Sequence, residues 1–212
     1  SEQAKSVQMQ IEAERLRNSL LSAISHDLRT PLATIVGSAS TLLEDDGHLN
    51  PEDKLDLSRA ILDEAERMSN LINNILDMAR LDAGVIKLNK QWHPVEELIG
   101  TVLTGMQKHL HDRQVKVNIP PGIPLVYADA VLIEQVLINL IENALRYTPA
   151  GTNIEIHVET SQQETKIAIA DYGPGIPKGQ EGQLFEKFYQ AQSEGAQSGV
   201  GLGLAICRAI VE

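Results

Sequence analysis

Residues 25–32 read Ser25-His26-Asp27-Leu28-Arg29-Thr30-Pro31-Leu32, and they lie inside a long amphipathic helical pattern. Thr30 shares a helical face with His26 because it lies one turn further on, and Asp27 is the next residue in the chain. Pro31 cannot donate a backbone hydrogen bond to the carbonyl of Asp27, so we expect the helix to bend there. These neighbours favour a reactive histidine over an ordinary surface one. A helical metal site is disfavoured, because no second histidine lies at i+3 or i+4.

The helical pattern around this stretch extends over residues 5–45, where apolar residues recur at spacings of three and four. Glu44-Asp45-Asp46-Gly47 ends it, and Asn50 then caps a second helix that begins at Pro51 and runs to Leu81. Two long helices with a short connection predict an antiparallel hairpin. One hairpin cannot cover both of its apolar stripes, so we expect two chains to pair into a dimeric four-helix bundle.

The pattern changes at residues 82–91, which we interpret as a domain boundary. Strands are predicted at residues 85–92, 115–119, 154–160 and 166–170, and helices at residues 95–112, 129–147 and from 202 onward. Strands and helices that do not strictly alternate predict an α/β sandwich with helices on one face of a sheet. The predicted fold class is therefore α + α/β, a helical hairpin followed by a sandwich domain.

Composition excludes several classes of function. The net charge of −11 over 212 residues argues against a nucleic-acid partner and against contact with a membrane surface. Cys207 is the single cysteine, so the chain cannot build a disulfide framework or a cysteine-based zinc site, and this usage fits a reducing compartment. No apolar run reaches the roughly 20 residues of a membrane span. Because the N-terminus starts within a helical pattern and without methionine, we expect a piece of a longer protein.

Polar side chains follow one stripe of the helix predicted at residues 129–147. Asn139 and Asn143 are one turn apart, Arg146 follows three residues later, and Tyr147 is adjacent to it. Amide oxygens suit Mg²⁺, which keeps waters and substrate phosphates among its ligands. This stripe therefore indicates a site for a magnesium ion and a triphosphate, although a solvent-exposed polar face is the simpler alternative.

Two glycine-rich stretches follow. Asp171-Tyr172-Gly173-Pro174-Gly175 comes directly after a predicted strand, where a carboxylate can accept a hydrogen bond from an exocyclic amine and glycines allow a close approach to a ligand. Residues 199–204, Gly-Val-Gly-Leu-Gly-Leu, open the last helix in the manner of a phosphate-binding loop. Between them, Phe185 and Phe188 suggest a segment that closes over a ligand.

In this order and spacing, the motifs resemble the H, N, G1, F and G2 boxes of the sensor histidine kinases of two-component systems, over nearly the whole chain. The resemblance implies a dimerisation and histidine-phosphotransfer domain at residues 1–84. It implies a catalytic ATP-binding domain with a Bergerat-type sandwich at residues 91–212. Domains of this family continue past the last helix into a further strand, whereas this chain ends at Glu212, so we expect the C-terminus of the domain to be incomplete.

The resemblance also implies roles for single residues. His26 attacks the γ-phosphate of ATP, Asp27 acts on its other ring nitrogen, and Thr30 positions water for dephosphorylating a partner. Asn143 ligates Mg²⁺ with support from Asn139. Arg146 and Tyr147 contact phosphates or ribose, and Asp171 reads the adenine amine. The remaining residues expected at the nucleotide are Gly173, Gly175, Ile176, Lys187, Phe188, Gly199, Gly201, Leu202, Gly203 and Leu204.

By the same resemblance, the partners are a second copy of the chain and the receiver domain of a response regulator, and the chain is the cytoplasmic portion of a bacterial inner-membrane sensor. One alternative is an ATPase of the gyrase and Hsp90 type, but that group places a water-activating glutamate where this chain has Asn139. The other is a dimeric scaffold with an inactive nucleotide pocket. Whether His26 is phosphorylated within its own chain or across the dimer stays open.

Overall fold

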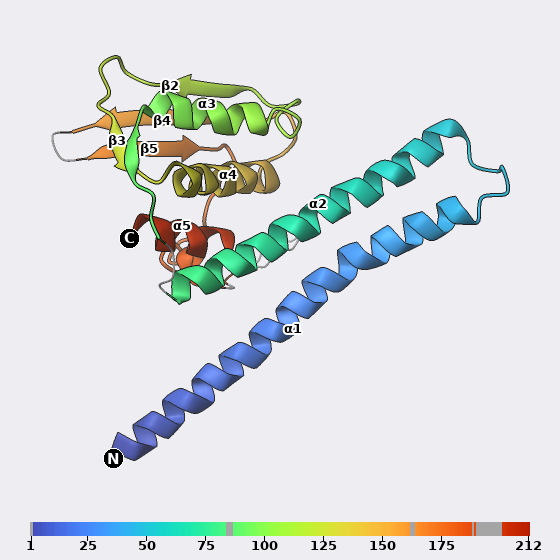
Figure 1. Cartoon of the computed structure of the whole chain (residues 1–212), viewed down its shortest axis with the longest axis horizontal. Coiled ribbons are helices and arrows are strands. Elements are labelled where there is room, and N and C mark those ends of the chain that lie inside the picture. Colours follow the sequence, from blue (N-terminus) through green and yellow to red (C-terminus); the bar gives the residue numbers. More distant parts are fainter. Residues whose placement is uncertain (1, 84–86, 162–163, 188, 190–200) are drawn as a thin grey trace. The chain divides into compact units, whose positions relative to one another are not determined.

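The computed structural model describes residues 2–83, 87–161, 164–187, 189 and 201–212 (Figure 1). These residues form two compact units, of which the first reaches Leu76 and the second begins at Asp77. In the described ranges, no helix is both long enough and apolar enough to span a membrane. The division at residues 1–84 and 91–212 stays a prediction.

The first unit is the predicted antiparallel hairpin (Figure 1). Helix α1 spans Glu2–Leu43 and helix α2 spans Pro51–Asp82. The Asn50 side chain accepts a hydrogen bond from the backbone N–H of Asp53 at 2.8 Å, as its role as the cap of α2 requires. Helix α1 continues through Pro31, whose side chain is fully buried, and the bend expected there stays a prediction.

The turn between the two helices is organised by one carboxylate. Asp45 Oδ1 accepts hydrogen bonds from the backbone N–H groups of Gly47, His48 and Leu49 at 3.0, 2.8 and 2.9 Å. Asp45 Oδ2 lies 2.6 Å from Lys54 Nζ on α2. The Lys54 ammonium, followed by the backbone N–H groups of Leu49 and His48, lowers the pKa of Asp45 to about 2. Gly47, with φ of 91°, supplies the left-handed backbone that the turn needs.

The second unit is the predicted sandwich (Figure 1). Strands β2 (Val115–Asn118), β4 (Ile154–Thr160) and β5 (Thr165–Ala170) form one sheet, with β2 parallel and β5 antiparallel to β4. Helices α3 (Val95–Gly105) and α4 (Ala130–Tyr147) lie along one face of this sheet. A 3₁₀ turn, η1 (Gln183–Phe185), contacts the last helix, α5 (Gly203–Val211).

Two predicted elements differ in extent from those in the structure. In the strand expected at residues 85–92, residues 85 and 86 lie outside the described residues, residues 87–90 form no strand, and Gln91 and Trp92 belong to β1 (Gln91–His93). Strand β1 pairs with β3 (Val126–Ala128), which the pattern did not predict. Three residues are too few to display an alternation, so the pairing of Trp92 with Tyr127, at 5.1 Å between ring centroids, identifies these strands. The helix expected to reach residue 112 ends at Gly105 and continues as turns.

The core of the second unit lies between the sheet and its helices. Along β4, Ile154, Ile156 and Val158 are buried, while Glu155 and His157 alternate with them. Helices α3 and α4 supply the other side of this core with Val95, Ile99, Val102, Leu137, Ile141 and Ala144. The inner face of α4 is therefore fixed against the sheet, which determines the direction of the polar stripe predicted to bind a nucleotide.

Candidate functional site

His26 is exposed on α1, with 78% of its side chain accessible. Its Nδ1 lies 3.2 Å from Asp27 Oδ1, so the carboxylate can accept the Nδ1–H of the neutral ring. The hydroxyl of Thr30 donates to the backbone carbonyl of His26 at 3.5 Å. The carboxylate thereby favours the tautomer in which Nε2 keeps its lone pair, and this nitrogen is the one available as a nucleophile.

Asn139 lies on the face of α4 that packs against α5. Its side chain is buried, and a Cβ added to Gly203 would stand 3.9 Å from its Oδ1. It also lies beside Cys207. Burial raises the pKa of the Cys207 thiol to about 11, and the Asn139 amide lowers it by a smaller amount. Among the described residues, Asn139 Nδ2 has no hydrogen-bond partner. An unpartnered buried amide suits a site that receives a polar ligand or water.

The rest of the polar stripe is more accessible. Asn143 is half-buried, and Arg146 and Tyr147 are exposed towards the C-terminal end of α4. Between them and Asn139 lies Glu142, whose pKa is raised by burial and lowered to a smaller extent by the charges of Arg146 and His109. The stripe therefore presents an amide oxygen and a cation, as a site for Mg²⁺ and phosphate groups requires.

Asp171 follows β5 and holds the start of the glycine-rich loop. Its Oδ1 accepts the backbone N–H of Gly173 at 2.9 Å. A Cβ at Gly173 would lie 2.9 Å from that oxygen, 3.0 Å from the carbonyl oxygen of Tyr147 and 3.2 Å from Thr148 Cγ2. The structure thus brings Asp171 and the end of α4 together, although they are far apart in the sequence. No larger residue fits at Gly173 without displacing one of these neighbours.

The same loop is attached to the sheet through Tyr172. Its hydroxyl donates to Glu155 Oε1 at 3.0 Å, while His157 Nε2 lies 2.9 Å from Glu155 Oε2. These two hydrogen bonds, that of His157 first, lower the pKa of Glu155, and the one to Glu155 raises the pKa of Tyr172. The loop that carries Asp171 is therefore attached to the sheet by a hydrogen bond and borders the end of α4 at Gly173.

The other predicted site residues lie in the glycine-rich loop after β5, after η1 and around the start of α5. Gly175 and Gly201 have φ of 76° and 69°, and Ile176 is exposed. Leu202 is buried, Gly203 and Leu204 are half-buried at the start of α5, and Lys187 is exposed after η1. Phe188 and Gly199 lie outside the described residues. The closing movement predicted for Phe185 and Phe188 stays a prediction.

Sequence reasoning missed Arg113, which lies just before β2. Its guanidinium donates to the carbonyl oxygens of Leu145, Thr148, Pro149 and Thr152 and to the hydroxyl of Thr148. These partners are 32 to 39 residues away in the chain, so no local pattern marks the arginine. From the sequence alone, a single arginine beside a short strand is expected to be a solvent-exposed charge.

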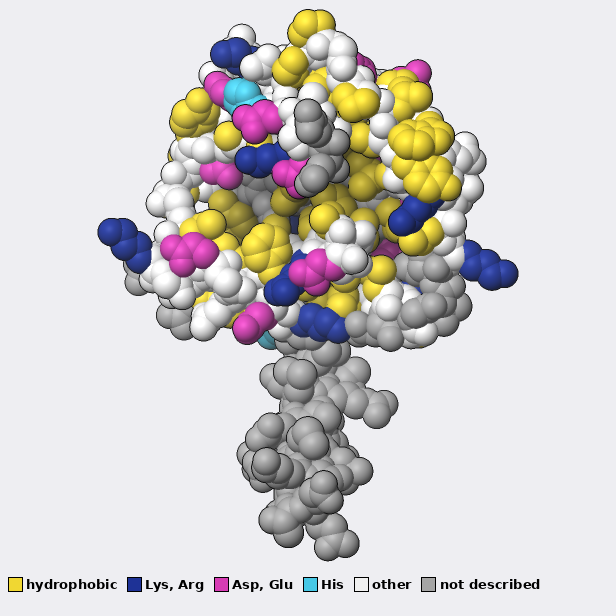
Figure 2. All heavy atoms as spheres, turned by 90° about the vertical axis from the view of Figure 1, so that its left-hand side faces the viewer, with side chains coloured by type: hydrophobic (Ala, Val, Ile, Leu, Met, Phe, Trp, Pro, Cys, Tyr) yellow, Lys and Arg dark blue, Asp and Glu magenta, His cyan; other side chains and the backbone are white. Residues whose placement is uncertain are grey.

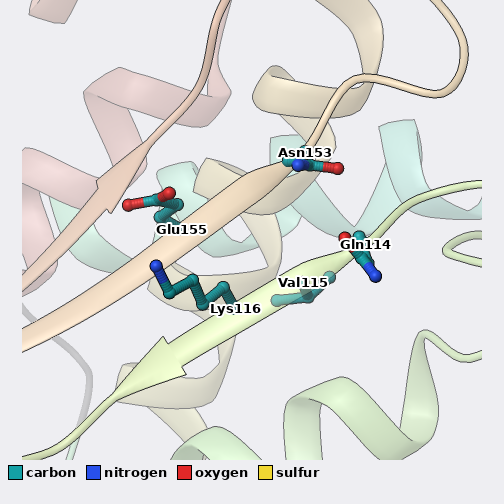
Figure 3. Close-up of a pocket in the computed structure, with 5 residues that line it drawn as sticks. All are labelled: Gln114, Val115, Lys116, Asn153 and Glu155. Atoms are coloured by element: carbon teal, nitrogen blue, oxygen red, sulfur yellow. The ribbon is translucent and has the colours of Figure 1, made fainter.

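A cavity of about 340 Å³ lies elsewhere on the second unit, against β2 and β4 (Figure 3). Gln114, Lys116, Asn153 and Glu155 line it, and the residues described around it include none of the predicted nucleotide-binding set. Figure 2 shows another hollow in which hydrophobic side chains gather, with acidic and basic side chains around it. The candidate site is therefore identified by the contacts and chemistry of its residues and not by this cavity. Glu155, which lines the cavity, also accepts the hydrogen bond from Tyr172 in the loop that carries Asp171.

Two known protein families match the chain. Residues 16–84 match the His Kinase A (phospho-acceptor) domain. Residues 128–212 match the family described as Histidine kinase-, DNA gyrase B-, and HSP90-like ATPase. The first match contains His26, Asp27 and Thr30, and the second contains the polar stripe of α4 and both glycine-rich stretches.

Individual proteins are similar over nearly the whole chain. The sensor protein KdpD of Escherichia coli K12 is 40% identical over 207 residues, which are 96% of this chain and 23% of that protein. The chain thus spans about a quarter of the length of this relative. The structure of the histidine kinase AdeS of Acinetobacter baumannii is 30% identical with a TM-score of 0.65, covering 88% of this chain and 85% of that one. ShkA in complex with AMPPNP is 27% identical with a TM-score of 0.62, covering 91% of this chain and 40% of that one.

Proposed function

The chain belongs to the sensor histidine kinase family of two-component signalling and carries the two domains of a protein histidine kinase, and we propose that it phosphorylates His26 with ATP. In this proposal the phosphoryl group then passes to an aspartate in the receiver domain of a response regulator. The contact between Asp27 and Nδ1 of the exposed His26 carries the proposal, because it leaves the other ring nitrogen free to react.

The reaction forms a bond between His26 Nε2 and the γ-phosphorus of ATP and breaks the bond from that phosphorus to the β–γ bridging oxygen, so that ADP leaves. As the ring becomes positively charged, the Asp27 carboxylate stabilises the charge and holds the ring in place. The Nδ1 proton stays between ring and carboxylate, while Nε2 bears the phosphoryl group. In the opposing reaction, which removes the phosphoryl group from the response regulator, Thr30 positions the attacking water.

The nucleotide is assigned to the end of α4 and the loop after β5. Asp171 would accept a hydrogen bond from the adenine amine, and Gly173 would allow the close approach. Arg146, Tyr147 and Lys187 would contact phosphates or ribose, and the glycines and leucines at residues 199–204 would surround the phosphates. Asn143 would ligate Mg²⁺ with support from Asn139, and the ion would neutralise charge on the phosphates. Two observations support this assignment: Asn139 Nδ2 has no hydrogen-bond partner in the described part of the chain, and an added Cβ at Gly173 would be crowded.

The partners proposed are a second copy of the chain, paired through the hairpin, and a response regulator. In the described part of the hairpin, several large apolar side chains are exposed in the single chain: Leu32, Val36, Leu55 and Leu62. Exposed apolar side chains of this kind are typical of a surface that a partner chain covers. The likeness to KdpD supports a cytoplasmic position in a bacterial inner-membrane sensor and a response to potassium or osmotic conditions. No nucleic-acid partner and no membrane contact of this segment are proposed.

A labelling experiment with γ-labelled ATP tests the proposal. We expect the chain to acquire a label that is lost in acid and stable in base, as phosphohistidine is. His26→Gln should abolish the label while leaving ATP binding unchanged, because the nucleotide contacts lie on the second unit. His48→Gln is the matched control, since His48 is an exposed histidine in the turn of the same hairpin. Persistent label on His26→Gln would refute the assignment of the phosphorylated residue.

A further inference from the structure

We infer that Arg113 is a positioning residue for the adenine end of the nucleotide site, and that it acts through the C-terminal end of α4. The inference rests on the proposed function, because it takes Asp171 as the residue that reads adenine. Arg113 does not belong to any of the sequence motifs and does not follow from them.

The guanidinium of Arg113 is almost fully engaged with one segment. Nη1 donates to Thr148 Oγ1 at 2.7 Å and to the carbonyl oxygens of Pro149 and Thr152 at 2.6 and 3.3 Å. Nη2 donates to the carbonyl oxygens of Leu145 and Thr148 at 3.2 and 3.1 Å. The side chain is only 6% exposed. The buried guanidinium therefore binds the last turn of α4 and the residues that directly follow the helix.

The physical reason lies in the end of the helix. The last carbonyl groups of a helix have no partners within it, and the helix dipole makes this end favourable for a cation. The planar guanidinium can bond several carbonyl oxygens at once, which a lysine ammonium on a flexible stem does less well. The nearest recorded carboxylate, Asp112 Oδ1, is 3.8 Å from Arg113 Nε, and that Nε has no hydrogen-bond partner among the described residues. The main contacts of this charge are therefore with Leu145 in the last turn of α4 and with residues 148–152 directly after it.

The end of α4 in turn borders the loop that carries Asp171. Thr148 accepts from Arg113 and donates its hydroxyl to the carbonyl of Ala144 at 2.6 Å, so its side chain has a fixed orientation. Its Cγ2, with the carbonyl oxygen of Tyr147, limits the space at Gly173. Gly173 donates its N–H to Asp171 Oδ1. We therefore expect a displacement of the end of α4 to shift Asp171, because Tyr147 and Thr148 border Gly173 and the N–H of Gly173 is hydrogen-bonded to the Asp171 carboxylate.

The hydrogen bond between Tyr172 and Glu155 makes the expected effect selective. It holds the same loop to β4 by a contact that does not involve Arg113. Without Arg113 the loop should stay attached to the sheet and lose its position relative to α4. We therefore expect a change in how well the site distinguishes adenine, in addition to any general loss of stability.

The test compares the Mg²⁺ complexes of ATP and GTP as probes, with affinities measured by calorimetry on the 212-residue chain. GTP carries an oxygen where adenine has its amine, so a well-placed Asp171 favours ATP. Arg113→Met should weaken ATP binding roughly tenfold, a loss typical of a small misplacement, and GTP binding much less, so that the preference falls. Arg113→Lys should retain part of the preference. It also serves as the test variant if Arg113→Met melts below the assay temperature.

Two further variants separate the possible outcomes. Val95→Ala removes volume from the core in α3 and should lower the melting temperature without changing the ratio of the two affinities. Asp171→Asn should lower the ratio. If Asp171→Asn lowers it and both Arg113 variants keep it at the wild-type value, the inference is wrong and the proposed function stands. If Asp171→Asn leaves the ratio unchanged, the assignment of Asp171 is wrong and the inference is wrong with it.

Discussion

At the scale of single residues, Gly173 is the described glycine at which an added side chain would be most crowded. An added Cβ would lie within 3.0 Å of both Asp171 Oδ1 and the carbonyl oxygen of Tyr147. We expect Gly173→Ala to weaken ATP binding roughly tenfold or more, since overpacking of a close contact costs about 1–3 kcal/mol. Calorimetric titration with ATP and Mg²⁺ measures the effect.

Gly100→Ala provides the control for this prediction. Gly100 lies within α3, and an added Cβ there would meet nothing within 4 Å. Alanine is the better helix former, so this variant should melt slightly higher and bind ATP as the wild type does. Equal ATP affinity in Gly173→Ala and wild type would show that the nucleotide does not use this loop.

At the scale of elements, the turn between α1 and α2 depends on the charge of Asp45. Its pKa in the folded chain is about 2, against 3.8 for the unperturbed group. Because the folded value is lowered, Asp45 contributes stability above the unfolded pKa and loses that contribution as the pH falls from about 4 to 2. We expect the urea midpoint of the helical circular dichroism signal to be higher for wild type than for Asp45→Asn at pH 5. The two midpoints should converge near pH 2.

Asp56→Asn is the matched control for the turn. Asp56 lies on the same hairpin, where its exposed carboxylate pairs with Arg59 at 3.4 Å. An exposed pair of this kind contributes little to stability, so this variant should follow the wild-type curve at both pH values. A difference between wild type and Asp45→Asn that persists unchanged at pH 2 would mean that the turn does not depend on the carboxylate charge.

At the scale of the whole molecule, the exposed apolar side chains of the hairpin predict its assembly. Leu32 and Val36 lie one turn apart on α1, and Leu55 and Leu62 lie two turns apart on α2, with exposed fractions between 48% and 57%. We expect the chain to sediment as a dimer. Leu62→Asp should raise the dissociation constant by about a hundredfold or more, because it places a charge in an apolar interface. Analytical ultracentrifugation over a range of concentrations measures the change.

Asn70→Asp adds the same charge to α2 at an exposed polar position that does not share the face of Leu55 and Leu62, and it should leave the dissociation constant near the wild-type value. A wild-type chain that sediments as a monomer at all concentrations would contradict pairing through the hairpin. Loss of pairing in both variants would indicate a general effect of charge on the hairpin.

Features that depend on residues close together in the chain could be predicted from the sequence. The hairpin, the capping of α2 by Asn50 and the buried alternation along β4 follow from helical and strand periodicity, and all are present in the structure. The proximity of Asp27 and Thr30 to His26 follows from the helix alone, because its geometry fixes which side chains one turn apart share a face. The order of the motifs was enough to indicate the family.

Tertiary structure alone decided which distant residues meet. The short pairing of β1 with β3, the position of Gly173 against Tyr147 and the contacts of Arg113 with the end of α4 all join residues far apart in the chain. Periodicity shows which face of an element is buried, but not which element covers it or which carbonyl group lacks a partner. These questions are settled only when the sheet and its helices pack. Packing buries the carbonyl groups at the C-terminal end of α4, and buried carbonyl groups need a hydrogen-bond donor, which Arg113 supplies.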